Sequence, residues 1–261
     1  MALLQVENLC MDFGGLRAVD QVSLSVEDGE IVALIGPNGA GKTTFFNCVT
    51  GHYAPTGGEI VISPPQGERA RIDGLKPNRV TALGLARTFQ NIRLFPAMTV
   101  LENVMIGRHC RTRTSLLGAI LRGPGTRRQE RETIDTSYRL LEKVGLLDVA
   151  DEFARNLSYG GQRRLEIARA LATDPFLLLL DEPAAGMNPQ ETRELDELIV
   201  RIRDEEGLAI LLIEHDMPLV MNLSDRIYVM EYGCKIAEGT PQQIRSNPRV
   251  IKAYLGEQDD A

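Results

Sequence analysis

The chain has 261 residues, of which 43% are hydrophobic and 25% are charged, and 29 Lys and Arg against 36 Asp and Glu give a formal charge of −7. This composition is typical of a globular protein and excludes disordered, collagen-like and low-complexity chains. The acidic balance also argues against a general nucleic-acid-binding protein, which normally carries a basic field. We therefore expect no nucleic acid among the partners.

Cysteine spacing and the length of the apolar runs limit the class of protein further. The four cysteines form no CxxC pair, so neither a metal site nor a disulfide framework is expected. The longest apolar runs, Phe176–Leu180 and Leu208–Ile213, are far shorter than the ~20 residues that span a bilayer. These features predict a soluble chain from a reducing compartment.

Strand patterns dominate the first part of the chain. Leu3–Val6 and Val22–Val26 are predicted as short strands, and the segment between them as a turn that carries Phe13. Ile31–Ile35 is a continuous apolar run of the kind found in buried parallel strands, and a helix is predicted to begin at Lys42.

A hairpin follows, and then the pattern changes. Glu59–Ile62 and Arg71–Ile72 are predicted to pair around a loop rich in Pro and Gly. From about residue 97 to 172 the pattern becomes mostly helical. The apolar residues that we place at helical spacing there are Ile134, Leu140, Leu141, Val144 and Leu147.

Strand patterns return at Phe176–Leu180, Ala209–Ile213 and Ile227–Met230. The order of these patterns predicts one α/β domain with a helical insertion. We expect a core formed by residues 1–96 and 174–240, a helical subdomain at 97–173 and a C-terminal tail at 241–261.

A phosphate-binding loop follows the apolar strand. Gly36–Thr43 reads GPNGAGKT, which matches GxxxxGK[ST] between a strand and a helix. Glycines let backbone N–H groups point at phosphate oxygens, Lys42 should reach the β and γ phosphates, and Thr43 should hold Mg²⁺. The residues expected to contact ATP here are Gly36, Pro37, Asn38, Gly39, Ala40, Gly41, Lys42, Thr43 and Thr44.

Two adjacent carboxylates end a later buried strand. Asp181 lies at the C-terminal end of the predicted strand, which is the end at which open α/β sheets bind their ligands. It is expected to hold Mg²⁺ through water. Glu182 is expected to orient or deprotonate the attacking water. The alternative is a pair of solvated carboxylates at a strand end.

Leu157–Leu171 reads LSYGGQRRLEIARAL, which resembles the signature helix of ATP-binding cassette (ABC) ATPases. Other elements of that family occur in order. Arg87–Gln90 resembles its Q-loop, Pro183–Asn188 its D-loop and Ile213–Asp216 its H-loop, while Phe13 stands where the family has an aromatic residue that stacks on adenine. The resemblance spans roughly residues 3–240.

This resemblance implies a P-loop NTPase core: a mostly parallel sheet with helices, an antiparallel β subdomain and an inserted helical subdomain. It implies hydrolysis of ATP with Mg²⁺, with Glu182, His215, Gln90 and Lys42 as catalytic residues. His215 would touch the γ-phosphate, although an isolated histidine is more often structural. Gln90 would link Mg²⁺ and water to a transporter contact.

The resemblance also implies two chains arranged head to tail. ATP would lie between the phosphate loop of one chain and the signature residues of the other, which are Ser158, Tyr159, Gly160 and Gly161. The chain departs from the family pattern at Tyr159, which replaces the first glycine of LSGGQ, and at Asn188, where the family usually has Asp.

A finer resemblance is to the ATPases of high-affinity branched-chain amino acid importers. It rests on Phe13–Val19, Ala184–Pro189, Leu212–Met217 and Ile251–Gly256. It implies two transmembrane permease subunits, a second ABC ATPase subunit that is a paralogue or an identical chain, and indirectly an extracytoplasmic solute-binding protein. The chain would lie peripherally at the cytoplasmic face of the inner membrane.

Other readings stay open at this stage: an ABC ATPase of lipopolysaccharide export or of urea or amide uptake, or a soluble ABC ATPase of DNA maintenance. The stretch Arg108–Arg131 is rich in arginine. It is either a solvated loop or a basic face toward anionic lipid headgroups or a membrane partner.

Overall fold

The computed structural model describes residues 2–111 and 124–255, and the chain forms two compact units. The first combines Met1–Arg87 with Phe176–Ala261, and the second is Thr88–Pro175. The sequence-based division placed the crossings at 96/97 and 173/174, so the structure assigns Gln90 to the second unit rather than to the core. The predicted α/β class with a helical insertion is confirmed.

A small antiparallel sheet opens the first unit. Its order is β2-β1-β4-β5, and a tight turn at Gly14 and Gly15 joins its first two strands. The strands are β1 (Ala2–Phe13), β2 (Leu16–Glu27), β4 (Gly57–Ile62) and β5 (Ala70–Arg71).

The prediction of two short strands joined by a long turn was wrong for this hairpin. Both strands have 12 residues, and Phe13 is the last residue of β1 rather than part of a turn. Asn8 and Gln21 both have φ of 48°, and the β1 and β2 register shifts near Asn8. Such bulges interrupt the alternation of apolar and polar residues, so the full strands have no continuous period of two.

A larger sheet forms the centre of the first unit, in the order β10-β9-β3-β8-β7-β6. All neighbours pair in parallel except β10, which is antiparallel to β9. Its strands are β3 (Ile31–Ile35), β6 (Leu85–Arg87), β7 (Leu177–Asp181), β8 (Ala209–Ile213), β9 (Arg226–Glu231) and β10 (Cys234–Gly239).

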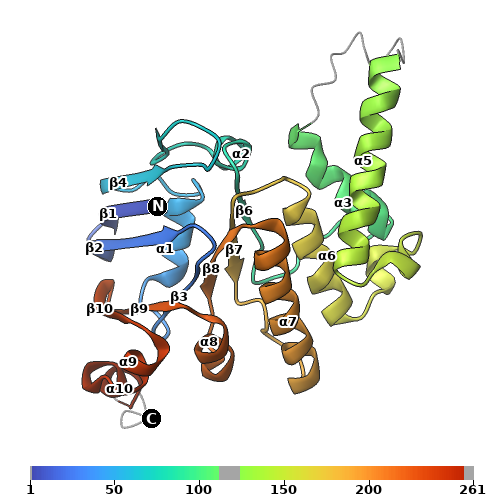
Figure 1. The fold of residues 1–261 in the computed structure, drawn as a ribbon. Coiled ribbons are helices and arrows are strands. Elements are labelled where there is room, and N and C mark those ends of the chain that lie inside the picture. The colour runs from blue at the N-terminus through green and yellow to red at the C-terminus, as the bar shows by residue number, and fades with distance from the viewer. Residues whose placement is uncertain (1, 112–123, 256–261) are drawn as a thin grey trace. The chain divides into compact units, whose positions relative to one another are not determined.

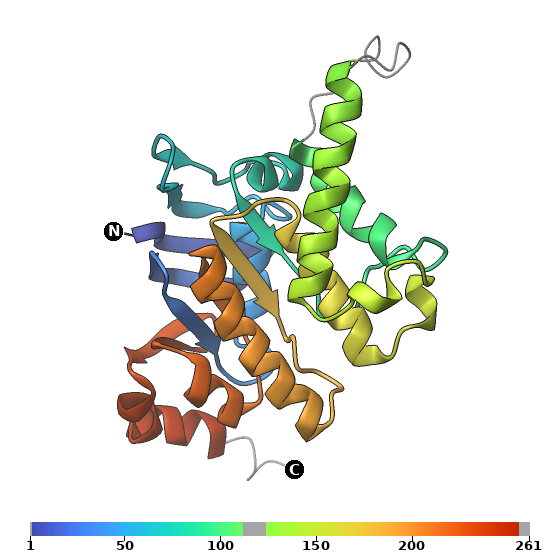
Figure 2. The same cartoon turned by 45° about the vertical axis from the view of Figure 1, so that its right-hand side comes forward.

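Helices cover both faces of this sheet. Figures 1 and 2 show α1 on one face and α7 on the other. Leu195, Leu198 and Ile202 form a buried stripe on α7, at the spacing of an amphipathic helix. The helices of the unit are α1 (Lys42–Val49), α2 (Pro77–Ala82), α7 (Pro189–Glu206), α8 (Met217–Leu223), α9 (Pro241–Arg245) and α10 (Pro248–Leu255).

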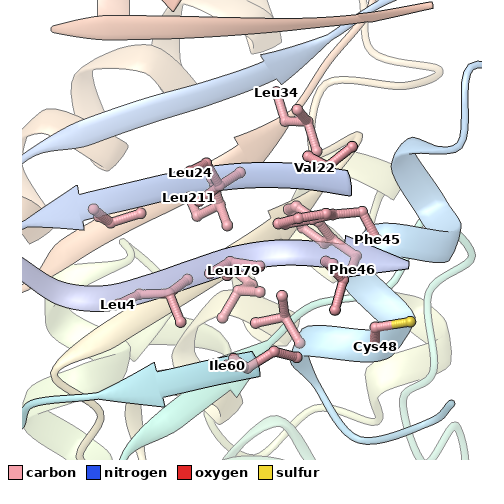
Figure 3. Packing of buried hydrophobic residues seen from close by; sticks show 14 of the residues in the cluster. Leu4, Val22, Leu24, Leu34, Phe45, Phe46, Cys48, Ile60, Leu179 and Leu211 are labelled. Carbon is pink, nitrogen blue, oxygen red and sulfur yellow. The ribbon is translucent and has the colours of Figure 1, made fainter. Parts of the chain in front are cut away.

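The main core lies between the two sheets and α1. Figure 3 shows side chains from β1, β2 and β4 gathering against Phe45 and Phe46 of α1 and against strands of the large sheet. Leu179 and Leu211 enter this core from the large sheet, and both are fully buried. The strands β3, β7 and β8 of the large sheet are buried on both faces, which explains why they are almost continuous apolar runs.

The second unit is helical. Leu147 lies beyond the long helix, in a short 3-10 turn after Gly145, and is 41% exposed, so its predicted place on the helix was wrong. Gly145 has φ of 68° and ends the helix as left-handed residues do. The elements among its described residues are α3 (Val100–Arg108), α5 (Pro124–Lys143), α6 (Tyr159–Leu171) and the 3-10 turns His109–Arg111, Leu147–Val149 and Ala154–Asn156.

A matched pair of substitutions in the β1–β2 hairpin tests the core. Leu4 is fully buried and Leu16 is 67% exposed. Leu4→Ala should lower the free energy of unfolding by about 2–5 kcal/mol, because it leaves a cavity. Leu16→Ala should change it by no more than about 0.5 kcal/mol. Chemical denaturation of both variants measures the difference, and equal losses would contradict the description of the core.

A carboxylate on α7 gives a pH-dependent prediction. Burial, followed by the charges of Asp216, Glu214 and Glu197, raises the pKa of Asp196 to about 6. The ionised form is therefore disfavoured in the folded chain, and this penalty is absent near pH 4, grows as the pH rises from about 4 to 6 and is complete above that. Asp196→Asn should remove it.

We expect Asp196→Asn to be more stable than the native chain at pH 8, by about 1 kcal/mol after allowance for solvent screening of a half-buried group. Near pH 4 the two proteins should have the same stability. Thermal unfolding at both pH values checks this. A variant equally stabilised at pH 4 and 8 would show that the charge is not the cause.

Candidate functional site

The parallel strands bring three predicted segments to one edge of the large sheet. β3 pairs with β8 and β8 with β7, and both Leu34 and Asp181 lie opposite Ile213. The carboxyl ends of these strands therefore lie side by side. The phosphate loop follows β3, His215 follows β8, and Asp181 ends β7.

The glycines of the phosphate loop are required by packing as well as by the approach of phosphate. Gly36 has φ of 149° and Gly41 has φ of 98°. A Cβ atom on Gly36 would collide with the carbonyl oxygen of Met230, and one on Gly41 with the carbonyl oxygen of Ala18. The loop thus lies flat against β9 and the start of β2, which only glycine permits at these two positions.

Lys42 lies inside this loop. Its side chain is buried, and Nζ donates hydrogen bonds to the carbonyl oxygens of Gly36, at 2.6 Å, and Pro37, at 2.9 Å. The loop therefore encloses an ammonium group next to backbone that curves around it.

The start of α1 suits an anion. Among the described residues no side chain caps its N-terminus, and its first turn holds no acidic residue. Helix N-termini attract anions through unpaired N–H groups and the helix dipole. Asn38, Gly39 and Thr43 are exposed, Thr44 and Pro37 are half-buried, and Ala40 is buried. A buried ammonium, a glycine cradle and the positive end of a helix fit a phosphate group, and the exposed Thr43 carries a hydroxyl of the kind that holds Mg²⁺ beside a bound nucleotide.

Asp181 and Glu182 occupy different environments although they are neighbours. The Asp181 carboxylate is almost completely buried and forms an ion pair with Arg87 at 2.6 Å. Glu182 has φ of 46°, and its N–H bonds to the carbonyl oxygen of Ile213. This turn takes the chain out of the strand and brings Oε1 of Glu182 to 2.7 Å from Nε2 of His215. The structure thus brings the predicted base and the predicted histidine together.

Glu214 is a residue of this site for which the sequence analysis gave no role. It is buried and accepts hydrogen bonds from the backbone N–H groups of Ala184, at 2.7 Å, and His215, at 2.8 Å. It therefore ties the loop after Glu182 to the loop that carries His215. A carboxylate directly after an apolar strand and before a histidine is the only sequence signal for it.

Phe13 is 42% exposed and forms an edge-to-face pair with Tyr53, with ring centroids 5.3 Å apart and an interplanar angle of 81°. Aromatic faces offered in this way can stack on a nucleotide base. Tyr53 was not among the predicted residues, because a single tyrosine in the loop after α1 carries no motif.

The remaining predicted residues lie in the second unit. The backbone of the segment before and after Gln90 is held by α6: Arg163 donates to the carbonyl oxygens of Phe89, at 2.6 Å, and Gln90, at 2.8 Å. Arg163 also pairs with Glu166 at 3.0 Å, and both side chains are buried. Burial raises the pKa of Glu166. The Gln90 residue itself is exposed.

The signature residues form the start of α6. Ser158 is the N-cap, and its Oγ accepts the N–H of Gly161 at 3.2 Å. The N–H of Gly161 is thus already engaged within the chain. Gly160 and Gly161 are buried, whereas Tyr159 is 43% exposed and its hydroxyl accepts a hydrogen bond from Arg163. Asn188 caps α7 by accepting the N–H groups of Gln190 and Glu191.

The arginine-rich stretch lies partly outside the described residues, which exclude 112–123 and with them Arg113 and Arg122. Arg127, Arg128 and Arg131 are exposed on α5, and Arg128 pairs with Glu132. Within the described ranges no helix is long and apolar enough to cross a membrane.

Comparison with known proteins agrees with this geometry. The family model described as ABC transporter matches residues 19–185, and the model described as branched-chain amino acid ATP-binding cassette transporter matches 234–260. The chain is 53% identical to the high-affinity branched-chain amino acid transport ATP-binding protein LivG of Escherichia coli and 51% identical to BraF of Pseudomonas aeruginosa, with 98% of each chain covered in both cases.

Among solved structures, the ADP conformation of MJ1267, an ATP-binding cassette of an ABC transporter, superposes with a TM-score of 0.84 at 33% identity. That superposition covers 98% of this chain and 99% of MJ1267. The extent of these matches, together with the phosphate loop and the Glu182–His215 pair, places the chain in the family of ABC transporter ATP-binding proteins, in the group that includes LivG and BraF.

Proposed function

We propose that the chain hydrolyses ATP to ADP and phosphate with Mg²⁺, and that this energises uptake of branched-chain amino acids through separate membrane subunits. The observation that carries the proposal is the contact between Glu182 and His215 at the same sheet edge as the phosphate loop. Identity of 53% to LivG over nearly the whole chain supports the choice of solute.

The chain's own residues supply most of the chemistry. Lys42 and the loop amides hold the phosphate oxygens and stabilise the charge that develops on them. Thr43 and Asp181 would hold Mg²⁺, with Asp181 acting through water and with a contribution from Gln90. Bound Mg²⁺ neutralises phosphate charge during the transfer.

Glu182 is the proposed general base. It orients a water molecule and accepts a proton from it as the water oxygen attacks the γ-phosphorus. The bond between that phosphorus and the β–γ bridging oxygen then breaks, and ADP departs. His215 lies within hydrogen-bond distance of Oε1 and holds that carboxylate in one orientation. In the proposed complex this ring, which is 41% exposed, would also contact the γ-phosphate.

The proposed working form is a head-to-tail dimer with a second ABC ATPase subunit. ATP would bridge the phosphate loop of one chain and Ser158–Gly161 of the other. ATP would therefore bind the closed dimer more tightly than the open one. Only a difference in affinity of this kind can shift the equilibrium between the two dimers. Two permease subunits, an extracytoplasmic binding protein and a peripheral position at the cytoplasmic face of the inner membrane complete the proposal.

Glu182→Gln tests the chemical assignment. It keeps the size of the side chain and removes the base, so turnover should fall about 10²- to 10⁴-fold while ATP binding is retained. Closed dimer should accumulate in ATP and be visible by size-exclusion chromatography. Glu68→Gln, the same change on an exposed loop residue, should leave turnover unchanged. Normal turnover in Glu182→Gln would refute the assignment.

Uptake in the native host tests the solute. Deletion of the gene should abolish high-affinity uptake of radiolabelled leucine, isoleucine and valine, and the native chain should restore it while Glu182→Gln should not. Lysine uptake serves as the control. Unchanged uptake of all three solutes, with loss of urea or amide uptake, would remove the amino-acid assignment and leave the ATPase assignment in place.

A further inference from the structure

Arg87 and Asp181 lie at neighbouring strand ends of the large sheet. Arg87 is the last residue of β6, which pairs in parallel with β7 so that Arg87 lies opposite Leu179. The two side chains are 7% and 6% exposed, and Nη2 of Arg87 donates to Oδ2 of Asp181 at 2.6 Å. A carboxylate that we assign to the metal ion thus already has a buried cationic partner.

The guanidinium is fixed from a second direction by α1. Its Nη1 donates to Oδ1 of Asn47 at 2.7 Å and to Oγ1 of Thr50 at 3.0 Å. Thr50 in turn donates to the carbonyl oxygen of Phe46, whose ring lies 5.7 Å from the guanidinium carbon. Asn47, Thr50 and Phe46 belong to the helix that begins at the phosphate loop, or directly follow it.

This network suits arginine and no other cation. The planar fork places two nitrogen atoms on different partners at the same time, whereas a lysine ammonium is a single point of charge on a flexible chain. A buried carboxylate whose partner is removed keeps the cost of its burial and reorients or neutralises. Loss of Arg87 would therefore remove the ion-pair partner that holds Oδ2 of Asp181.

We propose that Arg87 is a positioning residue that holds the Asp181 carboxylate in the orientation needed for Mg²⁺ bound with ATP. This inference rests on the proposed function, because it takes Asp181 as a metal contact. Arg87 would act through Asp181 and would touch neither nucleotide nor metal. It would connect the metal side of the site to the C-terminal end of the helix that carries Lys42 and Thr43.

Arg87 could instead weaken Mg²⁺ binding, and the direction of the change in Mg²⁺ affinity distinguishes the two roles. A cation beside Asp181 also opposes the approach of Mg²⁺, so removing a competing Arg87 would lower the Mg²⁺ requirement. The anchoring of Nη1 by Asn47 and Thr50 favours positioning, because a guanidinium held by three partners orients the carboxylate rather than following it.

Arg87→Met and Arg87→Lys test the proposal in binding assays. A fluorescent ATP analogue is titrated in EDTA, and Mg²⁺ is then titrated at fixed analogue. Mutating a residue that hydrogen-bonds to a metal ligand typically lowers metal affinity 10- to 100-fold. Arg87→Met should therefore raise the half-saturating Mg²⁺ concentration about tenfold or more. Arg87→Lys should lie between Arg87→Met and the native chain. Affinity in EDTA should stay within about twofold of the native value, since the loop and Lys42 carry that contact.

Arg71→Met is the matched control. Arg71 forms an ion pair with Asp73 at the same distance of 2.6 Å, but its side chain is 59% exposed and lies in the small sheet. It should leave both titrations unchanged. Thermal unfolding in EDTA shows whether each variant is folded, and Arg87→Lys carries the test if Arg87→Met is not.

Asp181→Asn separates the possible failures. If Arg87 acts through Asp181, Arg87→Met should have almost no further effect on the Mg²⁺ titration in the Asp181→Asn background. A normal Mg²⁺ titration in Asp181→Asn alone would overturn the metal assignment itself. A shift in Asp181→Asn without one in Arg87→Met would overturn only the inference.

Two further results would also overturn the role of Arg87. A lower Mg²⁺ requirement in Arg87→Met would show that the arginine competes with the metal. Equal weakening of analogue binding in EDTA and in Mg²⁺, unchanged by Asp181→Asn, would show a purely structural role.

Discussion

The parallel pairing of β3, β8 and β7 is the constraint on which the candidate site depends. A different functional group follows each strand: the glycine-rich phosphate loop follows β3, His215 follows β8, and the carboxylates Asp181 and Glu182 lie at the end of β7. Because the strands are parallel and in register, these ends meet without any long connection having to fold around a ligand. A slip of one residue between β8 and β7 would move Asp181 to the opposite face of the sheet.

Each unit buries a carboxylate, and in both units that carboxylate is paired with a buried arginine. Asp181 pairs with Arg87 in the first unit and Glu166 with Arg163 in the second. Each arginine also donates to other groups: Arg87 to Asn47 and Thr50, and Arg163 to two backbone carbonyls. Ion pairs this deeply buried contribute little net stability, but they hold their members in one arrangement. Arg87 directly precedes the segment that leads to Gln90, and Arg163 binds the backbone carbonyls of that segment.

The sequence was sufficient for features that a single residue pattern controls. β3, β8 and the start of α1 were predicted at their observed residues, because continuous apolar runs and the phosphate-loop motif are local signals. The length of β1 was not predictable, because the bulge near Asn8 breaks the alternation on which strand prediction relies. Leu147 had the spacing of a helix, but Gly145 ends that helix first.

The partners of the motif residues were beyond the reach of sequence reasoning. Arg87, Tyr53 and Glu214 each depend on contacts between residues far apart in the chain, 94 positions for Arg87 and Asp181. The glycines of the phosphate loop were identified correctly, but one reason for them, the backbone of Met230 and Ala18, becomes visible only when the sheet is assembled.

The anchoring on both sides of the two chain crossings has a mechanical consequence. On the first crossing Arg87 is held within its own unit, while the Phe89 carbonyl is held by α6, which leaves Thr88 between them. On the second, Arg111 holds the carbonyl of Asp174, and Phe176 bonds to Gly84, which leaves Pro175 between them. A rotation of one unit against the other would change backbone torsions at both crossings. Since proline fixes its own φ, Pro175 limits the torsions that the second crossing can contribute.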